Sequence, residues 1–256
     1  MRHRAPGTLD HMDNLIALVT GANKGIGKDI ARQLAAAGHT VYVGSRDAGR
    51  GRQAVADIDG DARLLVLDVT SAEGIAAAAE QVPLLDILVN NAGISSVDPR
   101  PVTEEHPDTF RRIYETNVFG VVAVTNAFLP ALRRSARPRI VNISSGAASL
   151  AASTGQAEGI IAFASGPTGA LGAYRSSKTA LNELTVLYAN ALTDDGFKVN
   201  ALAPGARRTD LNGPARVSSR AGDPAEGAAG AVRLALLPDD GPTGGFFSWD
   251  GTPVPW

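Results

Sequence analysis

Short apolar runs alternate with amphipathic segments along most of the chain. The runs predict strands at Leu15–Val19, Thr40–Gly44, Arg63–Leu67, Leu85–Val89, Arg139–Ile143, Lys198–Leu202 and Gly244–Trp249. Most of them are apolar throughout, which is typical of parallel strands that are covered on both faces. The pattern therefore predicts an α/β fold, with a doubly wound, mainly parallel sheet of about seven strands and helices on both faces.

Helices are predicted between these strands from apolar spacing and from capping residues. The predicted helices are one with Ile26, Ile30 and Leu34 on its apolar face, Gln53–Ile58, an alanine-rich helix capped by Ser71, a long region from about Thr109 to Arg134, a helix from about Tyr174 to Leu192, and one starting at Asp223. Pro130 predicts a kink or break in the long region, because proline removes a backbone donor. Asp223 is followed by proline and, three positions on, by glutamate, as in many helix starts.

The size of the chain suits one domain. It has 256 residues, of which 44% are hydrophobic and 20% charged, enough for a substantial core. We predict a single domain over residues 13–256, preceded by a disordered lead-in over residues 1–12 in which Met12 is an alternative start. The first residues carry basic side chains without an apolar stretch behind them, so they do not predict a secretory signal.

Charge and cysteine content exclude several classes of function. The net charge of −2 gives no global basic surface for nucleic acid or membranes. The chain contains no cysteine, which excludes disulfides, thiolate catalysis and cysteine metal sites, and we expect no metal site. No apolar stretch is long enough to cross a bilayer. A cytoplasmic protein that binds a small molecule is the default expectation.

A glycine-rich stretch, Thr20–Gly27, joins the first strand to the first helix. A turn of this kind directs unpaired backbone N–H groups and the positive end of a helix toward an anion. Gly21, Gly25 and Gly27 have the spacing G-x-x-x-G-x-G, which differs from the G-x-G-x-x-G dinucleotide fingerprint. On this evidence alone, the stretch is either a phosphate-binding turn or a tight loop without a ligand.

Three further groups of residues follow other predicted strands. They are Asn90-Asn91-Ala92-Gly93, the pair Ser144-Ser145 together with Tyr174 and Lys178 in the next helix, and Pro204-Gly205. Ligands of open α/β sheets bind at the carboxyl ends of the strands, where all these groups are predicted to lie.

Taken in order, these motifs resemble those of the short-chain dehydrogenase/reductase family. The matching residues are T-G-x-x-x-G-I-G at Thr20–Gly27, N-N-A-G at Asn90–Gly93, Asn117, Ser145, Y-x-x-x-K at Tyr174–Lys178 and P-G at Pro204–Gly205. The resemblance extends from about Leu15 to Trp256 and implies a Rossmann fold with a nicotinamide cofactor. The Asn23-Lys24 pair is similar to that of the carbonyl reductases of the family.

Tyr174 and Lys178 stand four positions apart and therefore share one face of a helix. An ammonium beside a phenol favours the phenolate, so we expect a lowered pKa for Tyr174 and a role as general acid or base. Ser145 is predicted to hydrogen-bond the same substrate oxygen, with Ser144 as local support. The resemblance implies that Lys178 also holds the nicotinamide ribose and that Asn117 anchors a water that relays protons to Lys178. Taken alone, Tyr174 and Lys178 would be read as an ordinary amphipathic pair.

The end of the second strand decides the choice of cofactor. An NAD enzyme places a carboxylate there, on the ribose hydroxyls. Here Ser45 and Arg46 precede Asp47, and the guanidinium of Arg46 suits a 2′-phosphate, with Lys24 adding a second charge. We therefore favour NADP (NADPH), with Asp47 as the argument for NAD.

The resemblance also implies the remaining cofactor contacts. Asp68 and Val69 resemble the pair that holds the adenine, and Thr209 matches the residue that contacts the carboxamide. The predicted cofactor-binding residues are Gly21, Asn23, Lys24, Gly25, Ile26, Gly27, Ser45, Arg46, Asp68, Val69, Asn91, Ala92, Gly93, Tyr174, Lys178, Pro204, Gly205 and Thr209.

Two features depart from the family pattern. Ser145 and Tyr174 are 29 positions apart, and the additional segment, with a predicted helical turn at Glu158–Phe163, implies by analogy with carbonyl reductases a monomer or dimer rather than a tetramer. Arg207 stands where the family often has an apolar residue. Arg207 and Arg208 could meet an acidic substrate or cofactor phosphates, but a solvated loop is the favoured interpretation.

The sequence thus predicts an oxidoreductase that reduces an aldehyde or ketone with NADPH. Two alternatives remain at this stage: a non-catalytic NADP sensor on the same fold, and an alcohol dehydrogenase that works in the oxidative direction. The substrate itself is not encoded in any motif.

Overall fold

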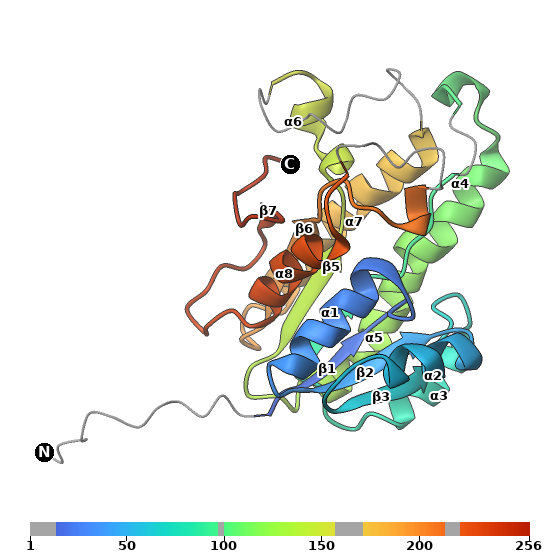
Figure 1. Ribbon diagram of the computed structural model, residues 1–256. Helices are drawn as coiled ribbons and strands as arrows, with labels where there is room; N and C mark the ends of the chain where they lie inside the picture. The colour runs from blue at the N-terminus through green and yellow to red at the C-terminus, as the bar shows by residue number, and fades with distance from the viewer. Residues whose placement is uncertain (1–13, 97–99, 157–170, 213–220) are drawn as a thin grey trace, which may run out of the picture.

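The computed structural model describes residues 14–96, 100–156, 171–212 and 221–256 (Figure 1). Its strands are β1 (Ile16–Val19), β2 (Thr40–Ser45), β3 (Ala62–Val66), β4 (Ile87–Asn90), β5 (Arg139–Ile143), β6 (Lys198–Ala203) and β7 (Phe246–Ser248). They form one sheet in the order β3-β2-β1-β4-β5-β6-β7, and every pair is parallel. The predicted doubly wound, seven-stranded fold is confirmed, with a sheet that is entirely parallel.

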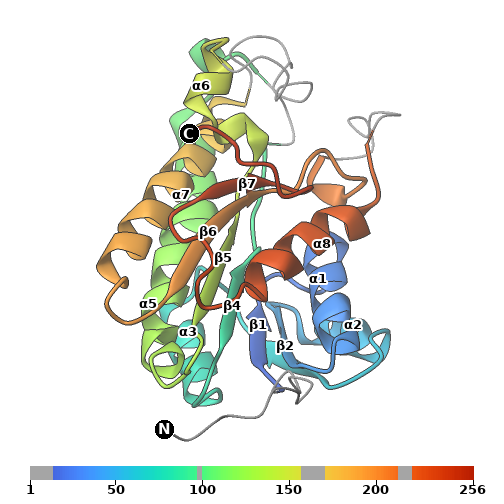
Figure 2. The same ribbon diagram turned by 90° about the vertical axis from the view of Figure 1, so that its left-hand side faces the viewer.

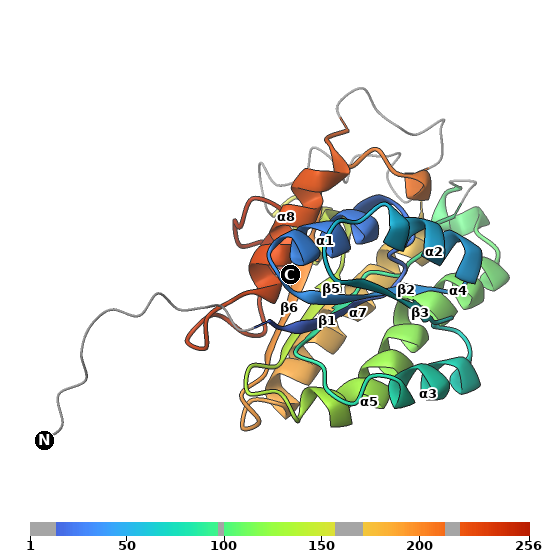
Figure 3. The same ribbon diagram turned by 60° about the horizontal axis from the view of Figure 1, so that its bottom comes forward.

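Helices cover both faces of this sheet (Figures 2 and 3). The α-helices are α1 (Gly25–Ala36), α2 (Ala48–Ala56), α3 (Ala72–Glu80), α4 (Pro107–Tyr114), α5 (Gly120–Leu132), α6 (Leu150–Ser153), α7 (Gly172–Ala191) and α8 (Pro224–Ala235). In both views α1, α2 and α8 lie on one side and α3, α5 and α7 on the other.

The apolar runs alternate between two cores, one under each layer of helices. In β1, Ala17 and Val19 belong to the core that includes α1 and α8, whereas Leu18 belongs to the core that includes α3 and α5. All three side chains are fully buried. A strand with both faces covered therefore needs apolar residues at every position, as in the sequence pattern.

The helix starts follow the predicted capping residues. Ser71 accepts a hydrogen bond from the N–H of Gly74 and caps α3, while Asp223 accepts one from the N–H of Ala225 and caps α8. Each side chain satisfies a backbone donor that has no partner inside the helix.

The predicted long helical region is interrupted at a different place from the one expected. Pro130 lies inside α5, whereas the break is a π-helical turn at Glu115–Phe119 between α4 and α5. Turns of this type are frequent at functional sites. The second helix also begins earlier than predicted, because Asp47 caps it by accepting a hydrogen bond from the N–H of Arg50.

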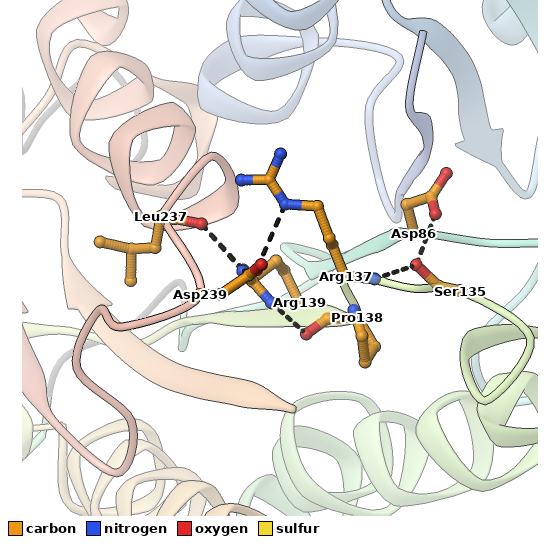
Figure 4. A network of polar contacts seen from close by, with 7 residues as sticks. All are labelled: Asp86, Ser135, Arg137, Pro138, Arg139, Leu237 and Asp239. Atoms are coloured by element: carbon orange, nitrogen blue, oxygen red, sulfur yellow. Dashed lines mark hydrogen bonds and ion pairs between the residues drawn. The ribbon is translucent and has the colours of Figure 1, made fainter. Parts of the chain in front are cut away.

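A polar network ties the amino end of β5 to the end of α8 (Figure 4). The buried guanidinium of Arg139 donates to the carbonyl oxygens of Pro138 and Leu237 and to the carboxylate of Asp239. Arg137 shares that carboxylate at 3.3 Å. These contacts lie at the opposite edge of the sheet from the predicted ligand site, so they serve the fold.

Within the described ranges, no helix has the length and apolarity to span a membrane. The same part of the chain contains no cluster of three or more His, Cys, Asp or Glu residues that could hold a metal ion. The predicted lead-in at residues 1–12 and the predicted turn at Glu158–Phe163 lie outside the described residues.

Candidate active site

The glycine-rich stretch forms a tight turn between β1 and α1. Gly21 and Gly25 have φ angles of 63° and 56°, which side chains disfavour. A Cβ on Gly27 would lie 2.3 Å from Nδ2 of Asn91 and 2.8 Å from the carbonyl oxygen of Gly21. Glycine is therefore required here by conformation at two positions and by close packing at the third.

The N-N-A-G motif after β4 is fastened directly to this turn. Oγ1 of Thr20 accepts hydrogen bonds from the backbone N–H groups of Asn91 and Ala92 at 3.0 and 2.9 Å. Nδ2 of Asn91 donates to the carbonyl oxygen of Thr20 at 2.8 Å. Two motifs about 70 positions apart thus become one wall at the point where the strand order reverses, the usual ligand site of such sheets.

A cavity of about 1220 Å³ opens at this edge of the sheet. It is lined by all the predicted cofactor-binding residues, from Gly21 to Thr209, and by Ser145, Tyr174 and Lys178. Asn117 does not line it, because its side chain is fully buried behind the wall. The structure therefore brings the predicted residues together from segments that span most of the chain.

Tyr174 and Lys178 lie in the first half of α7, beside the end of β5. Tyr174 makes a hydrogen bond with Ser145, which immediately follows that strand. Nζ of Lys178 donates to the carbonyl oxygen of Ile143 at 2.7 Å, and the side chain is 4% exposed. Oγ of Ser144 donates to Oδ1 of Asn182 at 2.6 Å, away from the phenol, as expected of a supporting residue.

Burial controls the protonation of this pair. Burial raises the pKa of Tyr174 above its usual value, and the hydrogen bond with Ser145 opposes this rise. Burial also lowers the pKa of Lys178 from 10.5 to about 8. The expected lowering of the Tyr174 pKa by Lys178 is wrong for the ligand-free protein, because desolvation of the phenolate is the largest influence and the ammonium donates to the carbonyl oxygen of Ile143.

Asn117 sits in the π-helical turn and holds the segment that follows N-N-A-G. Its side chain accepts a hydrogen bond from the N–H of Ile94 and donates to the carbonyl oxygen of Ile94, both at 2.9 Å. It also donates to Oγ of Ser177 at 3.0 Å, and Ser177 donates to the carbonyl oxygen of Tyr174 at 2.7 Å. This turn therefore links the cavity wall to the helix that carries Tyr174.

Ser177 is the residue that the sequence reasoning missed. It is fully buried, lies three positions after Tyr174 in α7, and connects Asn117 to the carbonyl oxygen of Tyr174. A small polar residue on the same helical face as Tyr174 was a signal that could have found it.

At the end of β2, Arg46 and Asp47, the residues that argue for NADP and for NAD respectively, have different surroundings. Arg46 is exposed and lines the cavity. Asp47 also lines the cavity, but its carboxylate accepts the N–H of Arg50 as the cap of α2. Oγ of the buried Ser45 donates to the backbone carbonyl of Asp47 at 2.8 Å and so stabilises this turn.

Lys24 has a partner that the sequence did not indicate. Its ammonium lies 2.8 Å from a carboxylate oxygen of Asp210, in the loop after β6. The same loop brings Thr209 close to the turn, since a Cβ on Gly25 would lie 3.5 Å from its methyl carbon. Lys24, which is predicted to bind the cofactor phosphate, therefore forms an ion pair with Asp210, another residue that lines the cavity.

The favoured interpretation of Arg207 as part of a solvated loop is wrong. Arg207 is 5% exposed, and its guanidinium carbon lies 4.5 Å from the ring centre of Trp249. It donates to the carbonyl oxygen of Pro204 at 2.6 Å and pairs with Glu226 in the first turn of α8. Arg208, in contrast, is exposed.

The cavity suits a phosphate-bearing dinucleotide. Gly21 and Gly27 leave no room for a Cβ, so the backbone of the turn can approach a phosphate at the positive end of α1. A Cβ on Gly93 would lie 3.5 Å from Nζ of Lys178, so this ammonium borders the bare backbone of the N-N-A-G motif. Arg46 and Lys24 add positive charge at the rim.

Comparisons with known proteins agree with this geometry. A model of the short chain dehydrogenase family matches residues 15–219. The short-chain dehydrogenase anuI of Penicillium roqueforti is 37% identical over 239 residues, which cover 86% of this chain and 88% of that protein. The (+)-neomenthol dehydrogenase of Arabidopsis thaliana is 35% identical over 288 residues, covering 91% of this chain and 95% of that protein.

A solved structure has the same fold. The NADPH-bound carbonyl reductase from chicken fatty liver superposes with a TM-score of 0.80 at 29% identity, over 94% of this chain and 98% of that one. Together with the family match, the order of the motifs and their convergence on one cavity lead to a single assignment. The chain belongs to the short-chain dehydrogenase/reductase family of oxidoreductases.

Proposed function

We propose that this protein reduces an aldehyde or ketone to the alcohol with NADPH, and that Tyr174 is the general acid. The observation that carries the proposal is the cavity that joins Tyr174, Ser145 and Lys178 to the glycine-rich turn and to Arg46. A carbonyl group placed against the phenol would lie in the same cavity as a cofactor held by the turn, and next to it.

In the proposed reaction, the cofactor supplies the hydride that adds to the carbonyl carbon. The proton comes from the phenolic oxygen of Tyr174 and completes the alcohol. A proton donor must hold its proton before the reaction, and burial, which raises the pKa of Tyr174, keeps it there at neutral pH. Tyr174 of the ligand-free enzyme is thus in the protonated form that the reductive step requires.

Ser145 and Lys178 would stabilise the charge that develops on oxygen. The Ser145 hydroxyl already makes a hydrogen bond with Tyr174, so it can reach the same substrate oxygen. The pKa of about 8 leaves Lys178 mostly protonated at neutral pH, and its positive charge favours the phenolate left after proton transfer. Its ammonium would also hold the nicotinamide ribose.

We propose that Asn117 acts mainly through the backbone that it holds. One acceptor site of Oδ1 is taken by the N–H of Ile94, and one remains for a water that relays a proton to Lys178. A Cβ on Gly93 would lie 3.4 Å from Oδ1 of Asn117, so this oxygen lies against the part of the cavity wall that borders Lys178.

NADPH is proposed over NADH because of the charges at the end of β2. The exposed guanidinium of Arg46 lines the cavity, and Lys24, which is ion-paired with Asp210, adds a second positive charge beside it. The carboxylate of Asp47, in contrast, is used as a helix cap. A monomer or dimer that binds a small carbonyl substrate remains the proposed working form.

The experiment is a spectrophotometric assay of NADPH oxidation against a panel of aldehydes and ketones. Tyr174→Phe should lose the activity while its affinity for NADPH, measured by fluorescence titration, stays within about threefold. Replacing Lys24 and Arg46 together by Met should weaken the binding of NADPH far more than that of NADH. The double variant Lys28→Met and Arg52→Met is the matched control, because it removes two other basic side chains. Equal background oxidation by wild type and Tyr174→Phe with every compound would refute the enzyme proposal.

A further inference from the structure

The backbone just before Tyr174 is unusual. Leu171 has a φ of 64° and a ψ of 37°, a left-handed conformation that a side chain disfavours. No other described residue except glycine has a positive φ. Such a conformation persists only where the surrounding structure holds it in place, and it is frequent at functional sites.

Among the described residues, the segment between β4 and α4 contacts the two residues that follow Leu171. A Cβ on Gly172 would lie 2.6 Å from Cγ2 of Val102 and 3.0 Å from Oε2 of Glu105, so the first residue of α7 packs closely against this segment. Oε2 of Glu105 accepts a hydrogen bond from the N–H of Ala173 at 3.0 Å. Glu105 thereby satisfies one backbone donor at the start of α7, in the residue next to Tyr174.

Glu105 is not an ordinary surface acid. Its Oε1 is buried and has no hydrogen-bond partner within the described ranges. A buried carboxylate oxygen without a partner is costly, so the hydrogen bond from the N–H of Ala173 is the contact among the described residues that offsets this cost. Glu105 does not line the cavity, so it cannot act on the cofactor by direct contact.

The other end of the same segment is also tied to Tyr174. Ile94 is held by Asn117, which donates to Ser177, and Ser177 donates to the carbonyl oxygen of Tyr174. Both ends of this segment are therefore hydrogen-bonded, directly or through Asn117 and Ser177, to the backbone around Tyr174. One end contacts the N–H of Ala173, and the other is linked to the carbonyl oxygen of Tyr174. Displacement of either contact would move the phenol relative to Ser145.

We propose that Glu105 is a positioning residue for Tyr174, which it holds in reach of Ser145 through the N–H of Ala173. This inference rests on the proposed function. Because the acceptor oxygen rather than the charge makes the contact, glutamine should replace Glu105 and alanine should not. A displacement of the order of 1 Å at a reacting group can cost about a hundredfold in rate.

The test compares Glu105→Ala, Glu105→Gln and the control Glu104→Ala, which alters an exposed neighbour. We expect Glu105→Ala to lower kcat at least tenfold with the KM and dissociation constant for NADPH within twofold of wild type. Glu105→Gln should recover kcat to within about threefold, and Glu104→Ala should leave it unchanged. A role in folding alone would lower the melting temperature without this selective loss of kcat in the folded enzyme.

Two results would overturn the inference: a kcat within twofold of wild type for Glu105→Ala, or an equal loss for Glu105→Ala and Glu105→Gln. If Glu105→Ala does not fold, Gly172→Ala tests the same contact, because its Cβ would lie 3.0 Å from Oε2 of Glu105 and so crowd the oxygen that accepts from Ala173. It should lower kcat in the same selective way, and an unchanged kcat would count against the proposal. Activity that survives Tyr174→Phe would instead refute the proposed function, so the two failures are distinguishable.

Discussion

The buried ammonium of Lys178 should make the stability of the ligand-free protein depend on pH in a defined window. Burial lowers the pKa of Lys178 from 10.5 to about 8 in the folded protein, whereas an unfolded lysine keeps the usual value. Between these two values the unfolded chain binds a proton that the folded protein does not. The free energy of unfolding therefore rises with pH over this window. Below pH 8, Lys178 makes no contribution to its pH dependence.

The size of the effect follows from the two pKa values. Each pH unit corresponds to about 1.4 kcal/mol, so the difference between 10.5 and about 8 amounts to about 3 kcal/mol. Lys178→Met removes this penalty and also removes the hydrogen bond to the carbonyl oxygen of Ile143, which costs about 1–3 kcal/mol. The variant should match or exceed the stability of wild type at pH 7.5 and fall below it by pH 10.

The assay is urea unfolding of the ligand-free wild type and Lys178→Met at several values between pH 7 and 10. The informative quantity is the difference between their free energies of unfolding, because contributions of other groups largely cancel. Lys28→Met, which removes a lysine paired with Asp57 at the surface, is the matched control and should keep the slope of wild type. A difference between wild type and Lys178→Met that does not change with pH would refute the reasoning.

Three further predictions concern the charges and the packing around the sheet. Asp210→Asn should tighten NADPH up to about fivefold relative to NADH in fluorescence titrations, since an exposed ion pair such as Lys24–Asp210 is worth at most about 1 kcal/mol; an unchanged ratio would contradict this. Gly27→Ala should lower the free energy of urea unfolding by about 1–3 kcal/mol, because its Cβ has no room, and wild-type stability would contradict it. Arg139→Met should cost more stability in thermal unfolding than Asp239→Asn, because Arg139 is 2% exposed and also serves two carbonyl oxygens, whereas Asp239 is largely exposed; equal losses would contradict it.

The pattern of apolar residues was sufficient to predict the layers of the fold. Strands buried on both faces need apolar residues at every position, and helix starts need side chains such as Ser71 and Asp223 that cap free N–H groups. Both requirements are local, so short stretches of sequence are enough to recognise them. The order of the motifs predicted a ligand site at the carboxyl ends of the strands, and all the predicted site residues except Asn117 line the cavity there.

Tertiary structure decided how the residues of that cavity interact. The pKa of Tyr174 rises because burial outweighs the hydrogen bond with Ser145, a residue that the fold brings to α7 from the end of β5. Lys24 meets Asp210, and Arg207 meets Trp249 and Glu226, through contacts between distant loops that no local pattern encodes. The sequence by itself determined the alternation of strands and helices and most of the residues that reach the cavity. Their protonation and their partners followed only from the packing, because both depend on groups brought together by the fold.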